Sequence, residues 1–216
     1  MRTGTRSSGE PPAARGPIPE PALEEIEGYL HQREQRREEL YQQARRLRRL
    51  AQATVSRLHG GTLAEADVPT VRRLLAELAS AVRREGRVDE PIAVDAFQEA
   101  VEACLLEAII ADRPLPPPAE LAVDPEPYLL GLGDVIGEVR RLVLACLGRD
   151  DLTAAERYLT LMERLTDTLL RFDTARAIVQ LKPKQDVART LLERTRGEVV
   201  MARLLVRARP PSEALP

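Results

Sequence analysis

The sequence predicts an all-α fold, a single-domain bundle of six or seven helices, and three observations lead to it. Apolar residues recur at helical spacing in every long segment, and no segment shows the alternation typical of a strand. Aromatic residues make up only 3% of the 216 residues, which favours helices packed through Leu, Val, Ile and Ala. Glycines and prolines stand where the helical patterns end. A chain of this length can build one sizeable core.

The two ends of the chain differ from its middle in composition. Residues 1–21 are rich in Pro, Gly, Ser and Arg and contain almost no apolar side chains. Such a segment cannot bury enough surface to offset the entropy cost of ordering. Residues 209–216 have the same character. We therefore expect two disordered tails that flank one helical domain of residues 22–208.

The first helical pattern runs from Leu23 to His59 and is closed by two glycines. Its apolar residues follow an unbroken heptad, which is typical of long helices packed side by side. From Leu40 to His59 the pattern contains no acidic residue, although the whole chain has a net charge of −2. A basic run is usually a solvated helix face, but this unbalanced one also suits contact with phosphate, and both interpretations stay open. Its candidate RNA-binding residues are Arg45, Arg46, Arg48 and Arg49.

The next two patterns cover residues 62–84 and 92–112. The second of them is apolar on two sides, and such a helix is usually buried on both. Glu99 and Glu102 lie one turn apart on it, with Asp95 on the same side. We expect these acids on a covered surface, where an isolated charge needs a partner.

A proline-rich loop, residues 113–127, leads into a helix over residues 128–147. Asp134 and Glu138 share one face of this helix, one turn apart, and two carboxylates in that position repel each other. Its interior also contains Gly131, Gly133 and Gly137, each costing roughly 1 kcal/mol relative to alanine. This combination indicates that another element lies close to the backbone and that a cation lies near the acids.

Three further helices complete the prediction. Asp150 or Asp151 can cap a helix over residues 152–172. Residues 174–181 resemble a short helix that breaks at Lys182 and Pro183. A last helix covers residues 187–206.

Several kinds of site and location are excluded by the residues present. The chain has no glycine-rich phosphate loop, and its two histidines lie about one helix length apart, so no role is assigned to them. Cys104 and Cys146 fall at apolar helix positions, as buried thiols of a reducing compartment do. No apolar run approaches the ~20 residues of a membrane span, and no signal peptide is recognisable. We expect a cytoplasmic protein without membrane contact.

Two pairs of carboxylates remain, Glu99 with Glu102 and Asp134 with Glu138. If their helices face each other, four hard oxygen ligands converge, which suits Mg²⁺ or Mn²⁺. Such a site can lower the pKa of a bound water and neutralise charge on phosphate. The alternative is two unrelated, exposed acid pairs, and the spacing alone favours that alternative.

Five segments of the chain resemble the translin superfamily. The most specific is YLLGLGDVIGE at residues 128–138, in which Gly133 stands where alanine is common, a change we expect to be harmless. The others are QEAVEA at residues 98–103, the stretch from Arg37 to Gly61, and the segments at residues 186–189 and 193–198. The resemblance covers roughly residues 24–207.

The resemblance implies a seven-helix subunit that assembles into a hollow homo-oligomer, typically an octamer, enclosing RNA. In the branch of translin-associated protein X, an E-x-x-E pair and a D-x-x-x-E pair form a metal-dependent endoribonuclease site. Both pairs are matched here, which implies that Glu99, Glu102, Asp134 and Glu138 hold the metal and act in catalysis. The implied substrate is single-stranded RNA, with single-stranded DNA as a further candidate ligand, and a second family member could replace some subunits.

Two other functions stay open. The chain could be a non-catalytic binder of single-stranded RNA or DNA, as translin itself is. It could also be a purely structural oligomer, although the acid-free basic stretch argues against this. Lys182, Lys184 and Arg141 are the next basic candidates for RNA contact.

Overall fold

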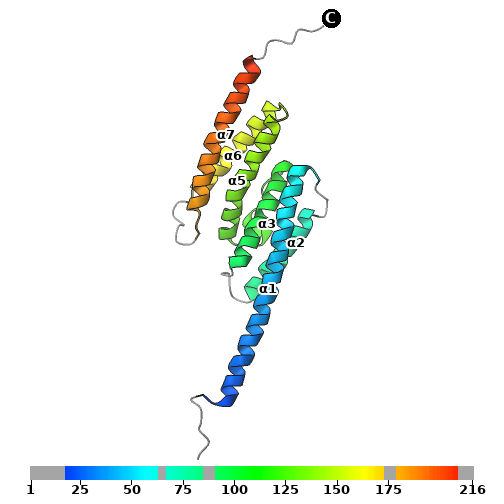
Figure 1. Cartoon of the computed structure of the whole chain (residues 1–216), viewed down its shortest axis with the longest axis vertical. Helices are drawn as coiled ribbons and strands as arrows, with labels where there is room; N and C mark the ends of the chain where they lie inside the picture. The colour runs from blue at the N-terminus through cyan, green and yellow to red at the C-terminus, as the bar shows by residue number, and fades with distance from the viewer. Residues whose placement is uncertain (1–17, 63–66, 85–90, 173–178, 209–216) are drawn as a thin grey trace, which may run out of the picture. The chain divides into compact units, whose positions relative to one another are not determined.

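The computed structural model describes residues 18–62, 67–84, 91–172 and 179–208, apart from the side chains of residues 91 and 92. These residues form seven helices and no strand (Figure 1), which confirms the predicted all-α class. The helices are α1 (Glu20–Gly60), α2 (Asp67–Arg84), α3 (Pro91–Ile110), α4 (Pro118–Leu121), α5 (Pro125–Leu147), α6 (Leu152–Leu170) and α7 (Lys182–Ala208).

The chain divides into two compact units, Met1–Glu39 and Leu40–Pro216. The described part of the first unit is dominated by the beginning of α1, where Leu23, Ile26 and Leu30 are exposed. Helix α1 begins at Glu20, so the last two residues of the predicted tail are helical. The rest of that tail, up to residue 17, and the tail at residues 209–216 lie outside the described residues.

The second unit contains the main hydrophobic core. Helix α5 contacts α3, α6 and α7, and α2 packs on α3 (Figure 1). Helix α1 adds its buried residues from Ala44 to Leu58 to the same core. Both cysteines are free and buried, as the sequence predicts. The largest side chains that are fully buried include Leu47, Leu75, Leu105, Ile136, Met162 and Leu169.

Two predicted boundaries are wrong. The proline-rich loop contains the short helix α4, which starts with Pro118 and ends at Leu121, followed by Ala122 in the left-handed conformation, φ 56°. Lys182 and Pro183 begin α7 rather than break a helix, because proline in a first turn loses no intrahelical hydrogen bond. The short helix predicted at residues 174–181 falls mostly outside the described residues, and residues 179–181 are not helical.

Two of the three glycines of α5, Gly131 and Gly133, mark close contacts as predicted, whereas a Cβ atom on Gly137 would meet only Leu191 Cδ1, at 3.9 Å. A Cβ atom on Gly131 would lie 2.7 Å from the Gln98 carbonyl oxygen and 2.8 Å from Val101 Cγ1, both in α3. Helices α3 and α5 therefore approach each other at this glycine more closely than any other residue would allow. The crossing lies within one turn of both acid pairs.

Candidate metal and nucleic-acid site

The four predicted acids gather where α3 faces α5. The structure therefore excludes two unrelated pairs of exposed acids. Burial, together with the nearby charges of Asp134, Glu138 and Glu99, raises the pKa of Glu102 to about 8. A carboxyl that responds to three other acids must lie close to them. We call Glu99, Glu102, Asp134 and Glu138 the acid cluster.

Glu102 is the buried member of the acid cluster, with 9% of its surface exposed. Within the described residues, its carboxyl has no hydrogen-bond or ion-pair partner, whereas the other three acids all have one. A buried carboxylate without a partner is costly in free energy. The site therefore favours either a proton on Glu102 or a cation beside it.

Helix α1 supplies partners to two of the acids. Nε2 of His59 lies 2.5 Å from Oε2 of Glu138. Gln52 donates from Nε2 to Oε1 of Glu99 at 2.8 Å, and Nε of Arg48 lies 3.5 Å from the same oxygen. The basic helix therefore borders the acid cluster directly.

Asp134 is engaged through both of its oxygens. Nζ of Lys184, at the start of α7, pairs with Oδ1, and Nε2 of Gln98 donates to Oδ2 at 2.5 Å. Arg141 adds a contact of 3.1 Å to Glu138. Nitrogen donors from α3, α5 and α7 thus occupy positions around the cluster that a cation could otherwise take.

The acid cluster fits a divalent metal in its donor chemistry but not in its present arrangement. Among the described residues, no group of three or more His, Cys, Asp or Glu side chains is arranged to hold a metal ion. The reason is that three of the acids face nitrogen donors instead of one another. The unpartnered Glu102 and the four hard oxygen donors nevertheless suit Mg²⁺ or Mn²⁺. Metal binding would require some of those nitrogen donors to move away.

The four candidate arginines of α1 fall into different surroundings. Arg48 is half-buried beside Glu99, whereas Arg45, Arg46 and Arg49 are exposed. The guanidinium of Arg45 lies 5.5 Å from the centre of the Tyr41 ring. Arg45 and Arg49 are therefore exposed basic residues on the same helix that contacts the acid cluster.

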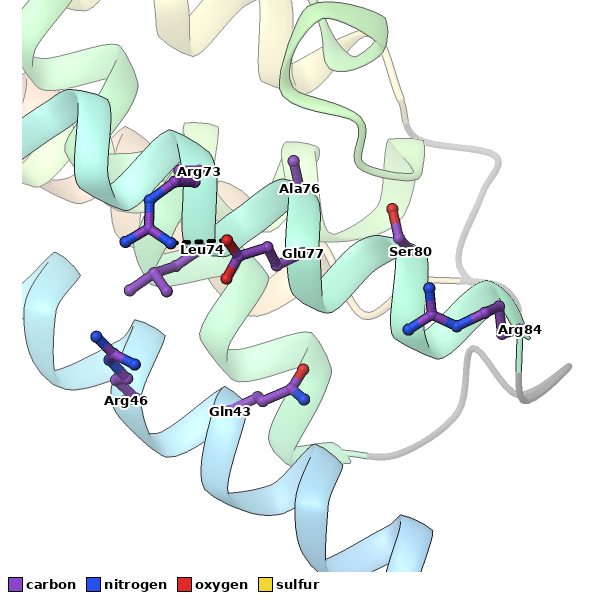
Figure 2. A pocket seen from close by; sticks show the side chains of 8 residues that line it. All are labelled: Gln43, Arg46, Arg73, Leu74, Ala76, Glu77, Ser80 and Arg84. Carbon is purple, nitrogen blue, oxygen red and sulfur yellow. Dashed lines mark hydrogen bonds and ion pairs between the residues drawn. The ribbon is translucent and has the colours of Figure 1, made fainter.

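Arg46 lines a separate pocket of about 660 Å³ between α1 and α2 (Figure 2). Two arginines of α2, Arg73 and Arg84, line it as well, and Glu77 pairs with Arg73 at 2.7 Å. Figure 2 shows Arg46 reaching from α1 toward the Arg73–Glu77 pair on α2. No spacing along the chain relates the arginines of these two helices.

The partners of the acids were missed by sequence reasoning. His59 had no assigned role, and Gln52 and Gln98 were not singled out. The signal that exists is position: Gln98 directly precedes Glu99, and His59 ends the acid-free stretch. Lys184 was named only as a further RNA contact.

In the described parts of the chain, no helix is both long enough and apolar enough to span a membrane.

Comparison with known proteins places the chain in a class. No protein-family model matches the sequence. It is 44% identical over 104 residues to the uncharacterized protein MJ0175 of Methanocaldococcus jannaschii, and that match spans about half of each protein, 48% of this chain and 47% of the relative.

Solved structures match over much more of the chain. The crystal structure of AfC3PO is 32% identical with a TM-score of 0.76, covering 85% of this chain and 98% of that one. The complex of AfC3PO with duplex RNA is 30% identical with the same TM-score, covering 87% and 100%. Apo-NeC3PO, at 19% identity and a TM-score of 0.75 over 84% and 97%, shares the fold.

The fold and the paired acids on α3 and α5 thus define the class of all-α proteins with two acid pairs on facing helices. The chain belongs to the translin superfamily. Within it, the chain is similar to the C3PO proteins.

Proposed function

We propose that the protein is a metal-dependent endoribonuclease that cuts single-stranded RNA inside a homo-oligomeric helical shell. The observation that carries the proposal is Glu102, a buried carboxyl without a partner among three other acids. A buried acid with a strongly raised pKa among other acids is typical of functional sites. In a cluster with only a structural role, the most buried carboxyl would be expected to have a hydrogen-bond or ion-pair partner.

The acid cluster supplies the residues for the chemistry. Glu99, Glu102, Asp134 and Glu138 would hold Mg²⁺ or Mn²⁺. When bound, such an ion lowers the pKa of water and neutralises charge on phosphate. A carboxylate of the cluster would accept the proton of the attacking water, and the contact of His59 would orient Glu138.

RNA as the ligand is supported by two observations. AfC3PO, which covers nearly all of this fold, is known in complex with duplex RNA. Helix α1 contacts the acid cluster through Gln52 and also carries exposed arginines, so that a phosphate backbone could lie along it. Single-stranded RNA is the proposed substrate, since it exposes its backbone and bases together, and single-stranded DNA is a second ligand to compare.

A closed homo-oligomer, an octamer in our proposal, would enclose the site. Exposed apolar residues on α7 supply surface for subunit contacts, and a second family member could take the place of some subunits. The two buried thiols suit a reducing compartment, and we propose the cytoplasm.

A second function is favoured by a specific observation. Three acids already have nitrogen partners, and the described residues hold no ready metal geometry. A non-catalytic binder of single-stranded RNA or DNA, of the translin type, would retain such a cluster as structural ion pairs.

Cleavage of a labelled single-stranded RNA in Mg²⁺, in Mn²⁺ or in EDTA separates these functions. We expect cleavage with either metal, none in EDTA, and none with Glu102→Gln or Asp134→Asn. Asp95→Asn is the matched control, because Asp95 is exposed on the same helix, one turn before Glu99. Binding without cleavage under every metal condition would establish the binder instead.

A further inference from the structure

Lys184 stands out among the residues that surround the acid cluster. It lies in the first turn of α7, directly over Gly133 of α5. A Cβ atom added to Gly133 would be 3.0 Å from the Cβ atom of Lys184. Its ammonium pairs with Oδ1 of Asp134, and 30% of its side chain is exposed. The missing side chain at Gly133 is therefore what lets this lysine cross α5 and reach the acids.

The ammonium of Lys184 acts on more than one acid. Besides its ion pair with Asp134, its charge opposes the effect of the three acids on buried Glu102. Among the described residues, Lys182 pairs only with Asp186 on its own helix, outside the cluster. Lys184 is thus a cation inside a group of four carboxylates, which is the place where a metal ion would bring positive charge.

Metal binding and the Lys184 contact exclude each other at Asp134. Oδ1 meets Lys184 and Oδ2 meets Gln98, so a metal can gain an oxygen of Asp134 only if one of these donors leaves. Two positive charges beside one carboxylate repel each other, so the lysine is the donor that moves. Its flexible stem allows this movement, and its partial exposure gives it space on the solvent side.

We infer that Lys184 is a resident counter-cation of the acid cluster, which a divalent metal displaces from Asp134 and which then contacts a phosphate of the RNA. This inference rests on the proposed function. It gives the lysine two successive partners: a carboxylate before the metal binds, and the substrate afterwards. Binding of the metal therefore frees the Lys184 ammonium to contact the phosphate.

The first test measures binding of Mn²⁺ alone by calorimetry. Lys184→Met keeps the length of the side chain and its packing over Gly133 but removes the competing charge. Two ligands that compete for one site are linked reciprocally. We expect the variant to bind Mn²⁺ about fivefold more tightly or better. Lys182→Met, the matched control, should bind Mn²⁺ like the wild type.

The second test measures RNA cleavage at saturating Mn²⁺. We expect Lys184→Met to cut about tenfold more slowly or worse, because a preformed charge at the phosphate is lost. Lys184→Arg should recover part of the rate. If Lys184→Met is poorly folded by circular dichroism, Lys184→Gln provides the same comparison with a polar side chain.

The outcomes separate this inference from the proposed function. If Glu102→Gln binds Mn²⁺ as well as the wild type, the acid cluster is not the metal site and the proposed function fails. If Glu102→Gln loses the metal but Lys184→Met binds it equally or more weakly, only the competition at Asp134 is refuted. Unchanged cleavage by Lys184→Met at saturating Mn²⁺ refutes the contact with phosphate.

Discussion

At the scale of single residues, burial and charge act on the Glu102 carboxyl in the same direction. Loss of solvent is the larger effect, and Asp134, Glu138 and Glu99 add to it, so that its pKa rises from 4.5 to about 8. At neutral pH the folded protein without metal therefore holds a proton on Glu102. A metal that binds there must release that proton, so metal affinity should rise with pH up to about 8.

The same pKa shift predicts how stability depends on pH in EDTA. Between about pH 4.5 and 8 the folded state binds more protons at Glu102 than the unfolded state does. The contribution of Glu102 is therefore fully present below pH 4.5 and is lost as pH rises toward 8. Its total is on the order of a few kcal/mol. Chemical denaturation at a series of pH values measures it.

Glu102→Gln isolates this contribution, because its amide does not ionise. We expect the wild type to lose unfolding free energy as pH rises and the variant not to. The variant should therefore become more stable relative to the wild type at higher pH. A constant difference across the whole range would show that Glu102 has an ordinary pKa.

The exposed arginines of α1 provide a prediction for RNA affinity. Replacing Arg45, Arg46 and Arg49 by Gln should weaken binding and reduce its salt dependence by ~0.7 per lost phosphate contact with a single strand. Arg48 is left intact, because it lies beside Glu99 and its removal would disturb the acid cluster. Binding isotherms at several salt concentrations give the slope, and an unchanged slope in a folded variant would place the RNA elsewhere.

The sequence predicts the acids of the site but not their partners, and chain distance explains the difference. Glu99 with Glu102, and Asp134 with Glu138, lie within one turn, so helical geometry alone places each pair on one face. His59 and Glu138 are 79 positions apart, and Lys184 and Asp134 are 50 apart. No periodicity relates positions so far apart, because the packing of α1 and α7 decides which side chains meet.

At the scale of elements, the crossing of α3 and α5 holds the acid cluster together. Gly131→Ala would place a methyl group 2.7 Å from the Gln98 carbonyl oxygen, and backbone cannot move away as a flexible side chain can. We expect a loss of about 1–3 kcal/mol in stability. Cleavage should fall as well, because the two acid pairs are pushed apart.

Gly137→Ala on the same helix is the matched control. Its added methyl group meets only Leu191 Cδ1, at 3.9 Å, and alanine should gain up to about 1 kcal/mol through helix propensity. Denaturation curves and cleavage rates of both variants test the crossing. Equal stability and equal cleavage rates of the two variants would contradict the role of the α3–α5 crossing.

The helix boundaries show where local signals are ambiguous. Asp151 caps α6 as predicted, accepting the N–H of Ala154 at 3.0 Å, because a cap is a local interaction. Proline at residue 183 can end one helix or begin the next, and only the following contacts decide. Lys184 on Gly133 and the buried Gln185, which donates to the Leu169 carbonyl at 3.0 Å, fix the start of α7.

At the scale of the whole molecule, the last turns of α7 expose an apolar surface. The buried residues of α7 end at Val199, yet the helix continues to Ala208. Its last turns expose five large apolar side chains, which single subunits rarely leave in water. These side chains are Val200, Met201, Leu204, Leu205 and Val206.

We expect light scattering to find an assembly larger than a dimer, well above the 24.0 kDa of one chain. The double variant Leu204→Asp and Leu205→Asp should reduce its mass, because charges would then lie in a subunit contact. Thr190→Asp, at an exposed position earlier on α7, should leave it unchanged. A wild-type protein that scatters as 24.0 kDa would refute the assembly.

Helix α1 carries both the exposed arginines and the residues that touch the acids. Its length therefore fixes the distance between these two groups. Arg45 and His59 are 14 positions apart on one continuous helix, which corresponds to about 21 Å. A strand held at Arg45 and cut beside His59 would be measured by that fixed length. If the protein cuts RNA as proposed, it would release fragments above a characteristic minimum size, set by this length along α1 rather than by the sequence of the RNA.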